Sequence, residues 1–372
     1  MKIKCQQADL AKGVNIVSKA VPTRTTMTIL QCILIDASSG EIKLTANDME
    51  IGIETIIEGT IIERGIIAID AKIFSEMVKK LPDNEVTIET DESFKTYITC
   101  GKAKFHIDLG KSGDDFSYIP VIPRNQPIII SQLTFRDIVR QTIFSVADTE
   151  NNKIMTGELF EISDNKLKVV ALDGHRVSIR NVELKNPAND VKVIVPKKTL
   201  NEITKIIDGG IDDMVSIYVT DNHIIFEFDT TTVVSRTIDG EFFKIEQMLS
   251  ADYETKVKVN KREFFDCIDR ATLLVKEGDK KPIIVNVEDG TMALSINSYI
   301  GSMDEEIDIT KEGKNIMIGF NPKFVIDALR VIDDEEINLY MLNAKSPCFI
   351  KDDKGTYTYI VLPVNFNNPG AN

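Results

Sequence analysis

The chain has 372 residues, of which 43% are hydrophobic, so it is long enough to form two or three hydrophobic cores. Its formal net charge of -14 by itself argues against a nucleic-acid partner. No apolar stretch approaches the roughly eighteen residues that a membrane helix needs, and Asp9 lies where a signal peptide would be apolar, so we expect neither a membrane span nor export.

Segments with the apolar spacing of a short amphipathic helix recur at nearly equal intervals along the chain. Three of them open at Lys72, Lys198 and Lys323, which are 126 and 125 residues apart, and they cover residues 71–82, 197–208 and 322–333. This interval is the size of a whole small domain and too long for a solenoid repeat. The sequence therefore predicts three copies of one domain.

Two further features recur at the same interval. A second amphipathic segment opens each third, at residues 8–21, 133–145 and 260–275. A turn followed by an alternating strand comes next, at residues 39–45, 164–170 and 289–295. We predict an α+β fold in which each copy lays two helices on antiparallel sheet, with domains at 1–125, 126–252 and 253–366 and a tail at 367–372.

The charge is unevenly distributed between the predicted helices and the rest of the chain. The six helical segments together carry +7, which leaves -21 for all other residues. Solvated helix faces often carry Lys, and this alone is one explanation. The alternative is a helical surface that faces a polyanion, on a body that repels it.

No catalytic constellation is recognisable. Gly110-Lys111-Ser112 resembles the end of a phosphate-binding loop, but Phe105 stands where the motif needs glycine. The three histidines lack metal-ligand spacing, and the five scattered cysteines are typical of buried, reduced thiols: His106, His175, His223, Cys5, Cys32, Cys100, Cys267 and Cys348. Asp173 with His175 leaves a hydrolase as a weak alternative, because no nucleophile accompanies them.

Two stretches distinguish one copy from the others. Gly174-His175-Arg176 occurs only in the second copy, and the apolar run 359–366 at the end of the third is interrupted by Pro363. Because proline cannot donate to a sheet ladder, we expect the chain to leave the sheet there. These stretches are either a loop and a strand end, or two local exceptions that together form one site.

Several motifs give the chain a specific resemblance. They are ALDGHRVS at 171–178, IVPKK at 194–198, IDGEF at 238–242, IGFNPKF at 318–324 and VLPV at 361–364, with Ile29-Leu30 and residues 45–48 in the first copy. With them the chain resembles the bacterial DNA sliding clamp, the beta subunit of DNA polymerase III, over residues 1–366. The resemblance implies a head-to-tail homodimer, a ring of six domains around duplex DNA, with no catalytic activity and no cofactor.

The resemblance also implies residues for three surfaces. A pocket for short peptides of the polymerase alpha subunit, the clamp loader and repair proteins would comprise Met155, Leu172, Gly174, His175, Arg176, Val177, Phe243, Met248, Asn321, Phe324, Lys345, Ser346, Pro347, Ile360, Leu362, Pro363 and Val364. Sequence-independent DNA contacts would be Arg24, Lys197 and Lys198, and the dimer interface would include Phe105, Leu273 and Leu274. Within the pocket, we expect His175 and Arg176 to supply polar contacts at the rim.

The sequence departs from the family pattern at Leu172, Phe243 and Asn365, where Thr, Pro and Arg are common, and this puts the pocket's selectivity in question. The implied location is the bacterial cytoplasm, at the nucleoid. A repeat-built adaptor that binds proteins and never DNA remains the main alternative function, with the hydrolase behind it.

Overall fold

The structure is a computed structural model that describes residues 1–108, 110–116, 119–120, 122–124, 126–148, 152–249, 252–276, 281–352 and 354–366, except for the side chains of Gln247 and Met248. The chain divides into two compact units. Unit 1 comprises residues 1–136, 185–188 and 198–237, and unit 2 comprises residues 137–184, 189–197 and 238–372.

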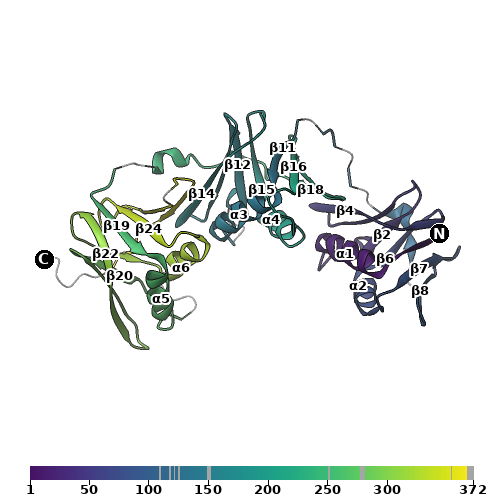
Figure 1. The fold of residues 1–372 in the computed structure, drawn as a ribbon, viewed down its shortest axis with the longest axis horizontal. Coiled ribbons are helices and arrows are strands. Elements are labelled where there is room, and N and C mark those ends of the chain that lie inside the picture. Colours follow the sequence, from purple (N-terminus) through teal and green to yellow (C-terminus); the bar gives the residue numbers. More distant parts are fainter. Residues whose placement is uncertain are drawn as a thin grey trace. The chain divides into compact units, whose positions relative to one another are not determined.

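Unit 1 contains two antiparallel sheets (Figure 1). The smaller has the order β5 (Thr60–Glu63), β1 (Lys2–Gln6), β7 (Glu85–Thr90), β8 (Thr96–Cys100), β9 (Ala103–Ile107). The larger has the order β10 (Lys111–Ser112), β6 (Ile66–Asp70), β2 (Cys32–Asp36), β3 (Ile42–Asn47), β4 (Ile51–Ile57), β18 (Thr231–Arg236), β17 (His223–Phe228), β16 (Met214–Val219), β11 (Ile128–Ser131). The pairing of β4 with β18 joins strands from the first and second copies into one sheet.

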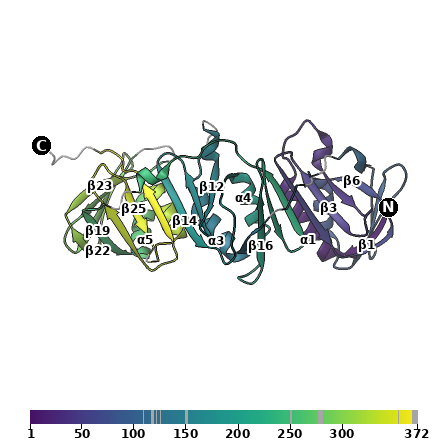
Figure 2. The same cartoon turned by 90° about the horizontal axis from the view of Figure 1, so that it is seen from above.

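Unit 2 contains one long antiparallel sheet (Figure 2). Its order is β15 (Val191–Pro196), β12 (Gly157–Ser163), β13 (Lys166–Leu172), β14 (Arg176–Glu183), β26 (Tyr357–Val361), β25 (Cys348–Lys351), β24 (Glu336–Met341), β19 (Thr255–Asn260), β22 (Ser302–Gly313), β21 (Thr291–Asn297), β20 (Ile283–Val287), β23 (Ile316–Phe320). Here β14 pairs with β26, so the second and third copies are joined in the same way as the first and second.

Polar side chains cap the first turn of several helices. The described helices are α1 (Gln7–Val17), α2 (Ala71–Lys80), α3 (Gln132–Thr142), α4 (Lys197–Thr204), α5 (Lys261–Thr272) and α6 (Pro322–Val331). Asp70 accepts from the Ile73 N–H, Asn260 accepts from the Arg262 and Glu263 N–H groups, and Asn321 accepts from the Lys323 N–H. Each cap satisfies backbone donors that have no partner within the helix.

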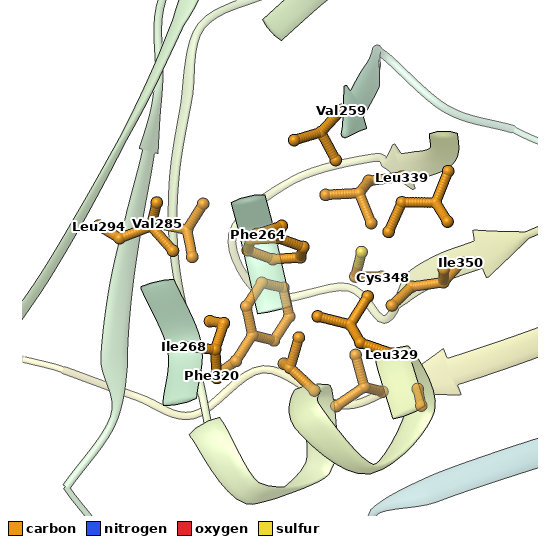
Figure 3. Packing of buried hydrophobic residues seen from close by; sticks show 14 of the residues in the cluster. Val259, Phe264, Ile268, Val285, Leu294, Phe320, Leu329, Leu339, Cys348 and Ile350 are labelled. Carbon is orange, nitrogen blue, oxygen red and sulfur yellow. The ribbon is translucent and has the colours of Figure 1, made fainter. Parts of the chain in front are cut away.

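Each pair of helices buries its apolar stripe against the sheets. In the third copy, Phe264 and Ile268 of α5 and Leu329 of α6 pack on Val285 and Leu339 of the strands, and Figure 3 shows this core from close by. In unit 1, α1 approaches the sheet closely because it carries Gly13. A Cβ at that position would lie 2.5 Å from Cγ2 of Ile57.

The predicted α+β repeat is confirmed, and so are its turns. Gly40 and Gly290 have positive φ angles, as do both Asp164 and Asn165 in the second copy. The amphipathic segments at 71–82, 197–208 and 322–333 form helices that end at Lys80, Thr204 and Val331, and after Thr204 the backbone tightens into a turn. All five cysteines are buried free thiols. Among the described residues, no helix is long and apolar enough to cross a membrane.

Glu158 on β12 is a fully buried acid, and burial raises its pKa to about 8 against the smaller opposing effects of Thr142 and Lys197. Between pH 4.5, the ordinary pKa of a glutamate, and about pH 8, Glu158 of the folded chain keeps a proton that the unfolded chain has lost. The free energy of unfolding should therefore fall by about 1.4 kcal/mol for each unit of rising pH in this window, from this group alone.

We predict that Glu158→Gln removes this pH dependence and stabilises the chain most at pH 8, as measured by denaturant unfolding from pH 5 to 8. Glu161→Gln on the same strand is the control. Lys192 and Lys168 hold the pKa of Glu161 below its ordinary value, so its ionisation falls outside this window. Equal pH slopes for wild type and Glu158→Gln would contradict the prediction.

Candidate functional site

A tight turn joins β13 to β14 in unit 2 and carries the Gly174-His175 pair. The Asp173 N–H donates to the Arg176 carbonyl at 3.3 Å, and Asp173 Oδ1 accepts from the N–H groups of His175 and Arg176 at 2.9 and 3.1 Å. Gly174 has a φ of 88°, and a Cβ there would meet nothing within 4 Å, so glycine serves the backbone conformation and not a close contact. The turn leaves His175 exposed.

Arg176 points beneath this turn and is only 8% exposed. Its Nε donates to Asp173 Oδ2 at 2.9 Å, Nη1 to Asp327 Oδ2 at 2.8 Å and Nη2 to the Phe144 carbonyl at 2.6 Å. The guanidinium also lies over the rings of Phe324 and Phe144, at 4.6 and 5.4 Å from their centroids. Three of the five guanidinium N–H donors of Arg176 thus hold its side chain beneath the turn, and its expected polar contact at the pocket rim stays a prediction.

An apolar cluster lies where the sheet continues from β14 to β26. Leu172, Val177 and Ile360 are buried in this cluster, and Met155 packs against it half-buried. The other buried members are Leu159, Val170, Ile179, Ile194, Ile238, Ile245 and Phe349. These four predicted pocket residues therefore come together, three of them as a floor covered by their neighbours.

The C-terminal run meets the same turn. Strand β26 ends at Val361, as the proline predicted, and the Leu362 N–H then donates to the His175 carbonyl at 2.9 Å. The Val364 N–H donates to the Gly319 carbonyl at 2.8 Å, and residues 362–364 stay half-buried. The His175 ring stacks on Phe324 at a centroid distance of 5.9 Å. The two stretches that distinguish single copies thus lie together, and we call residues 173–176, Met155, Phe324 and 362–364 the partner surface.

The remaining predicted pocket residues have other observed contacts. Asn321 caps α6, and Phe243 is exposed with its ring edge-on to Phe242. Lys345 and Ser346 donate their N–H groups to Asn343 in a turn that Pro347 follows, half-buried. Within the described part of the chain, no hydrogen bond or ring contact joins Phe243 or residues 345–347 to the turn at Gly174. The side chain of Met248 lies outside the described part of the structure.

Comparison with known proteins decides the family. Models of the N-terminal, central and C-terminal domains of the DNA polymerase III beta subunit match residues 1–120, 129–244 and 246–365. The chain belongs to the DNA polymerase III beta subunit family. It is 33% identical over 361 residues to the beta sliding clamp of Staphylococcus epidermidis, covering 94% of this chain and 95% of that protein.

Solved structures of sliding clamps have the same fold. The DNA polymerase sliding clamp of Bacillus subtilis is 33% identical, with a TM-score of 0.95 over 99% of this chain and 100% of that one. A candidate DNA polymerase III beta subunit from Eubacterium rectale is 71% identical, with a TM-score of 0.96 over 98% and 100%. As a member of the sliding-clamp family, the chain is a non-catalytic processivity subunit of a DNA polymerase.

The hydrolase alternative is not favoured by the geometry of Asp173 and His175 either. A turn does bring these residues together, but Asp173 binds the backbone N–H of His175 and the guanidinium of Arg176. Both carboxylate oxygens of Asp173 therefore serve the turn of the sliding clamp. Among the described residues, no group of three or more His, Cys, Asp and Glu side chains could hold a metal ion.

The three predicted DNA contacts differ in how they are held. Arg24 is exposed between the short helices Ser18–Ala20 and Thr28–Gln31. Lys198, at the start of α4, is ion-paired with Asp48. Lys197 donates to Asp148 at 2.6 Å, and this hydrogen bond holds the pKa of Asp148 below its ordinary value. A phosphate that binds Lys197 or Lys198 would therefore compete with a carboxylate.

The predicted dimer residues lie at open positions, with one exception. Phe105 is 42% exposed on β9, which pairs only with β8 among the described strands, and Leu273 is 77% exposed after α5. Leu274 instead packs half-buried against the core of the third copy. Truncating Leu274 would therefore disturb the fold as well as any interface, and Leu273 is the cleaner probe.

Sequence reasoning missed Asp327 and Phe144, which hold Arg176 in place. Asp327 lies in the third copy's helix, but Glu76 and Glu202 occupy the same position in the other two copies, so the acid gives no distinguishing signal. Phe144 contributes its backbone carbonyl and its ring, and an apolar residue after a helix indicates neither.

Proposed function

We propose that the chain acts as a processivity factor by closing a head-to-tail homodimer around duplex DNA and tethering a polymerase to it. The observation that carries this proposal is a pair of open strand edges. β9 pairs only with β8, and residues 302–308 of β22 pair only with β21, among the described strands. Unpaired edges of this kind are templates for pairing with another chain.

The two junctions inside the chain supply the geometry for closing the ring. The same turn hydrogen bond occurs once in each copy: the N–H of Asp48 donates to Ile51, that of Asp173 to Arg176 and that of Ser298 to Gly301. Two residues after each acceptor come Ile53, Ser178 and Met303, which are therefore equivalent positions. Ile53 pairs with Val233 and Ser178 pairs with Tyr359. When paired residues are followed from strand to strand within each copy, Phe105 of the first copy is equivalent to Val233 of the second and Tyr359 of the third. If two chains join by the same strand pairing as the copies within one chain, Phe105 lies opposite Met303 of the partner subunit.

This register also matches charge and hydrophobicity across the proposed interface. It sets Lys104 opposite Asp304 and Lys102 opposite Glu306, on one face of the joined sheet. In the described part of the chain, none of these four side chains has an ion-pair partner of its own. On the other face Phe105 meets Met303, near Leu274, whose side chain lies 3.6 Å from a Cβ built on Gly301.

Duplex DNA would pass along the helices, whose charge differs in sign from that of the rest of the chain. Flexible Lys and Arg side chains bind phosphates without reading bases, so the ring would slide instead of stopping at a sequence. Loose contacts suit this function, and the ion pairs of Lys197 and Lys198 with Asp148 and Asp48 keep them loose.

We predict that changing Arg24, Lys197 and Lys198 together to Ala lowers loading onto circular DNA and flattens the salt dependence of DNA binding. The log–log salt slope should fall by about one unit for each phosphate contact that is lost. The dimer should remain intact in sedimentation, because none of the three residues lies on the proposed strand edges.

The matched control changes Lys185, Lys244 and Lys314 to Ala, which removes the same charge from residues outside the helices. If the control and the test variant lose loading equally, the named residues have no special role. Retention of wild type on circular but not on linear DNA separates a sliding clamp from a protein-binding adaptor, which should show no retention on either.

The partner surface would take short peptides with apolar anchors from the polymerase alpha subunit, the clamp loader and repair proteins. Half-buried Met155, Phe324 and Leu362 offer apolar contact area, and methionine adapts to varied side chains. We place this activity in the bacterial cytoplasm, at the nucleoid, where duplex DNA and the polymerase are found.

A further inference from the structure

The junction of the first and second copies, within unit 1, repeats the backbone geometry of the partner surface. β4 pairs with β18 as β14 pairs with β26, and the preceding turns are closed by the same hydrogen bond. Six positions of the second junction are thereby matched at the first. The pairs are Leu172 with Asn47, Gly174 with Met49, His175 with Glu50, Val177 with Gly52, Ile360 with Val234, and Leu362 with Arg236.

A cavity of about 140 Å³ lies at this matching position. All six matching residues line it, and the other lining residues are Ile119, Pro120 and His223. A neighbouring cavity of about 180 Å³ shares Ile119, Pro120 and Val234. The hollow at the first junction is more polar, because Asn47, Glu50 and Arg236 stand where the second junction has Leu172, His175 and Leu362.

The segment that joins the two copies partly fills this hollow, and we call its described residues, 119–120 and 122–124, the connector. A Cβ built on Gly52 would lie 2.7 Å from Cγ1 of Ile119, so Ile119 occupies the space that a side chain at position 52 would take. Val177, at the matching position, does carry a side chain. Ile122 is 8% exposed and packs with Ile225 and Val234 in a separate apolar cluster.

The connector is held by side-chain contacts and one ion pair, as a separate bound peptide could be. In the described part of the chain, Ile119, Pro120, Ile122 and Pro123 make no hydrogen bond to the sheet, and the prolines have no N–H to donate. Arg124 ends the segment with an ion pair to Glu227. Two isoleucine anchors three residues apart, each followed by a proline that restricts the backbone, make a preorganised apolar ligand.

We propose that the first junction is a second docking site for an extended apolar peptide, and that the chain's own connector, through Ile119 and Ile122, is its occupant. The tether gives this segment an effective concentration in the millimolar range, so a free peptide of similar affinity cannot displace it. The chain thus keeps one of its two matching junctions open to partners. The proposal uses the partner surface as a structural template and does not depend on what binds there.

The test removes the two isoleucine side chains from the site and adds the same segment as a separate peptide. The full-length Ile119→Ser, Ile122→Ser variant is titrated with a fluorescently labelled peptide that has the sequence of residues 116–126. We expect one peptide to bind per chain, at least tenfold more tightly than to wild type, whose site is filled. The matched control is Ile211→Ser, a change at an exposed isoleucine of unit 1, and it should bind like wild type.

A second change locates the binding. Adding Gly52→Val to the emptied variant fills the space of Ile119 and should abolish binding of the labelled peptide. Equal binding by wild type and the emptied variant would overturn the proposal, and so would binding that survives Gly52→Val. Should the double serine variant unfold, Ile119→Ser alone carries the same comparison, because Ile119 is only half-buried.

If removing residues 362–372 from the emptied variant abolishes binding of the labelled peptide, the peptide binds on the partner surface, and this result would also overturn the proposal. Failure of a polymerase-derived peptide to bind wild type is a separate result that bears on the proposed function alone.

Discussion

Removing residues 362–372 is expected to abolish binding of a polymerase alpha-subunit peptide while leaving the dimer intact. The deletion removes the half-buried Leu362, Pro363 and Val364, together with the hydrogen bonds to the carbonyls of His175 and Gly319. A few central contacts carry most of the energy of such small interfaces, so the loss should exceed about 100-fold in Kd. Calorimetry with a synthetic peptide measures it.

Removing only residues 367–372 is the matched control, and it should bind the peptide like wild type. His175→Ala should weaken the same peptide more mildly, because its ring stacks on Phe324 while its backbone carbonyl remains available to Leu362. Wild-type affinity after removal of residues 362–372 would sink the assignment. A deletion variant that unfolds would show instead that the C-terminal run is a structural strand end.

Reversing the charge of Lys102 and Lys104 to Glu is expected to weaken the dimer strongly. Each lysine would then face an acid, Glu306 or Asp304, directly across the proposed pair of strands, and like charges in that position repel. A ring has two such interfaces, so the total cost should be about 2–4 kcal/mol. The dimer Kd should rise at least about 30-fold, as measured by sedimentation across a concentration series at low salt.

The register is tested by rescue. Adding Asp304→Lys and Glu306→Lys to the same chain restores opposite charges at both interfaces and should recover most of the lost affinity. Lys185→Glu with Lys244→Glu is the charge-matched control at two exposed lysines outside β9 and β22, and it should dimerise like wild type. If the four-residue variant dimerises no better than the two-residue variant, the strands do not pair in this register.

The repeat could be predicted from the sequence because its signal is local. Helix stripes such as Phe74 and Val78, turn residues such as Gly40, and the alternation after them depend on neighbours within a few positions. The end of β26 was predictable for the same reason, since Pro363 cannot donate to a ladder. Among the predicted pocket residues, Leu172 and Val177 were named through a motif, and their burial was not foreseen.

The contacts that escaped prediction join residues far apart in the chain. Arg176 reaches Asp327 across 151 positions, and nothing in the local pattern distinguishes a buried arginine from one at a rim. Ile119 and Ile122 sit in a proline-rich stretch that is typical of a loop, and their packing depends on the missing side chain of Gly52. Such features depend on which surfaces the folded repeats bring together.

The burial of Arg176 also limits how the partner surface can change over generations. Replacing it would leave the carboxylate of Asp173 without its cation and Asp327 with only the longer ion pair to Arg330 at 3.7 Å, and losing one partner of a largely buried pair typically costs about 3–5 kcal/mol. Gly174 is constrained as well, because its φ of 88° strains any other residue. Inherited shifts in partner preference, and escape from peptide-like inhibitors, are therefore left to half-buried positions such as Met155 and Leu362. A saturation mutagenesis scan under selection would record this as tolerance at those two positions beside intolerance at Gly174 and Arg176.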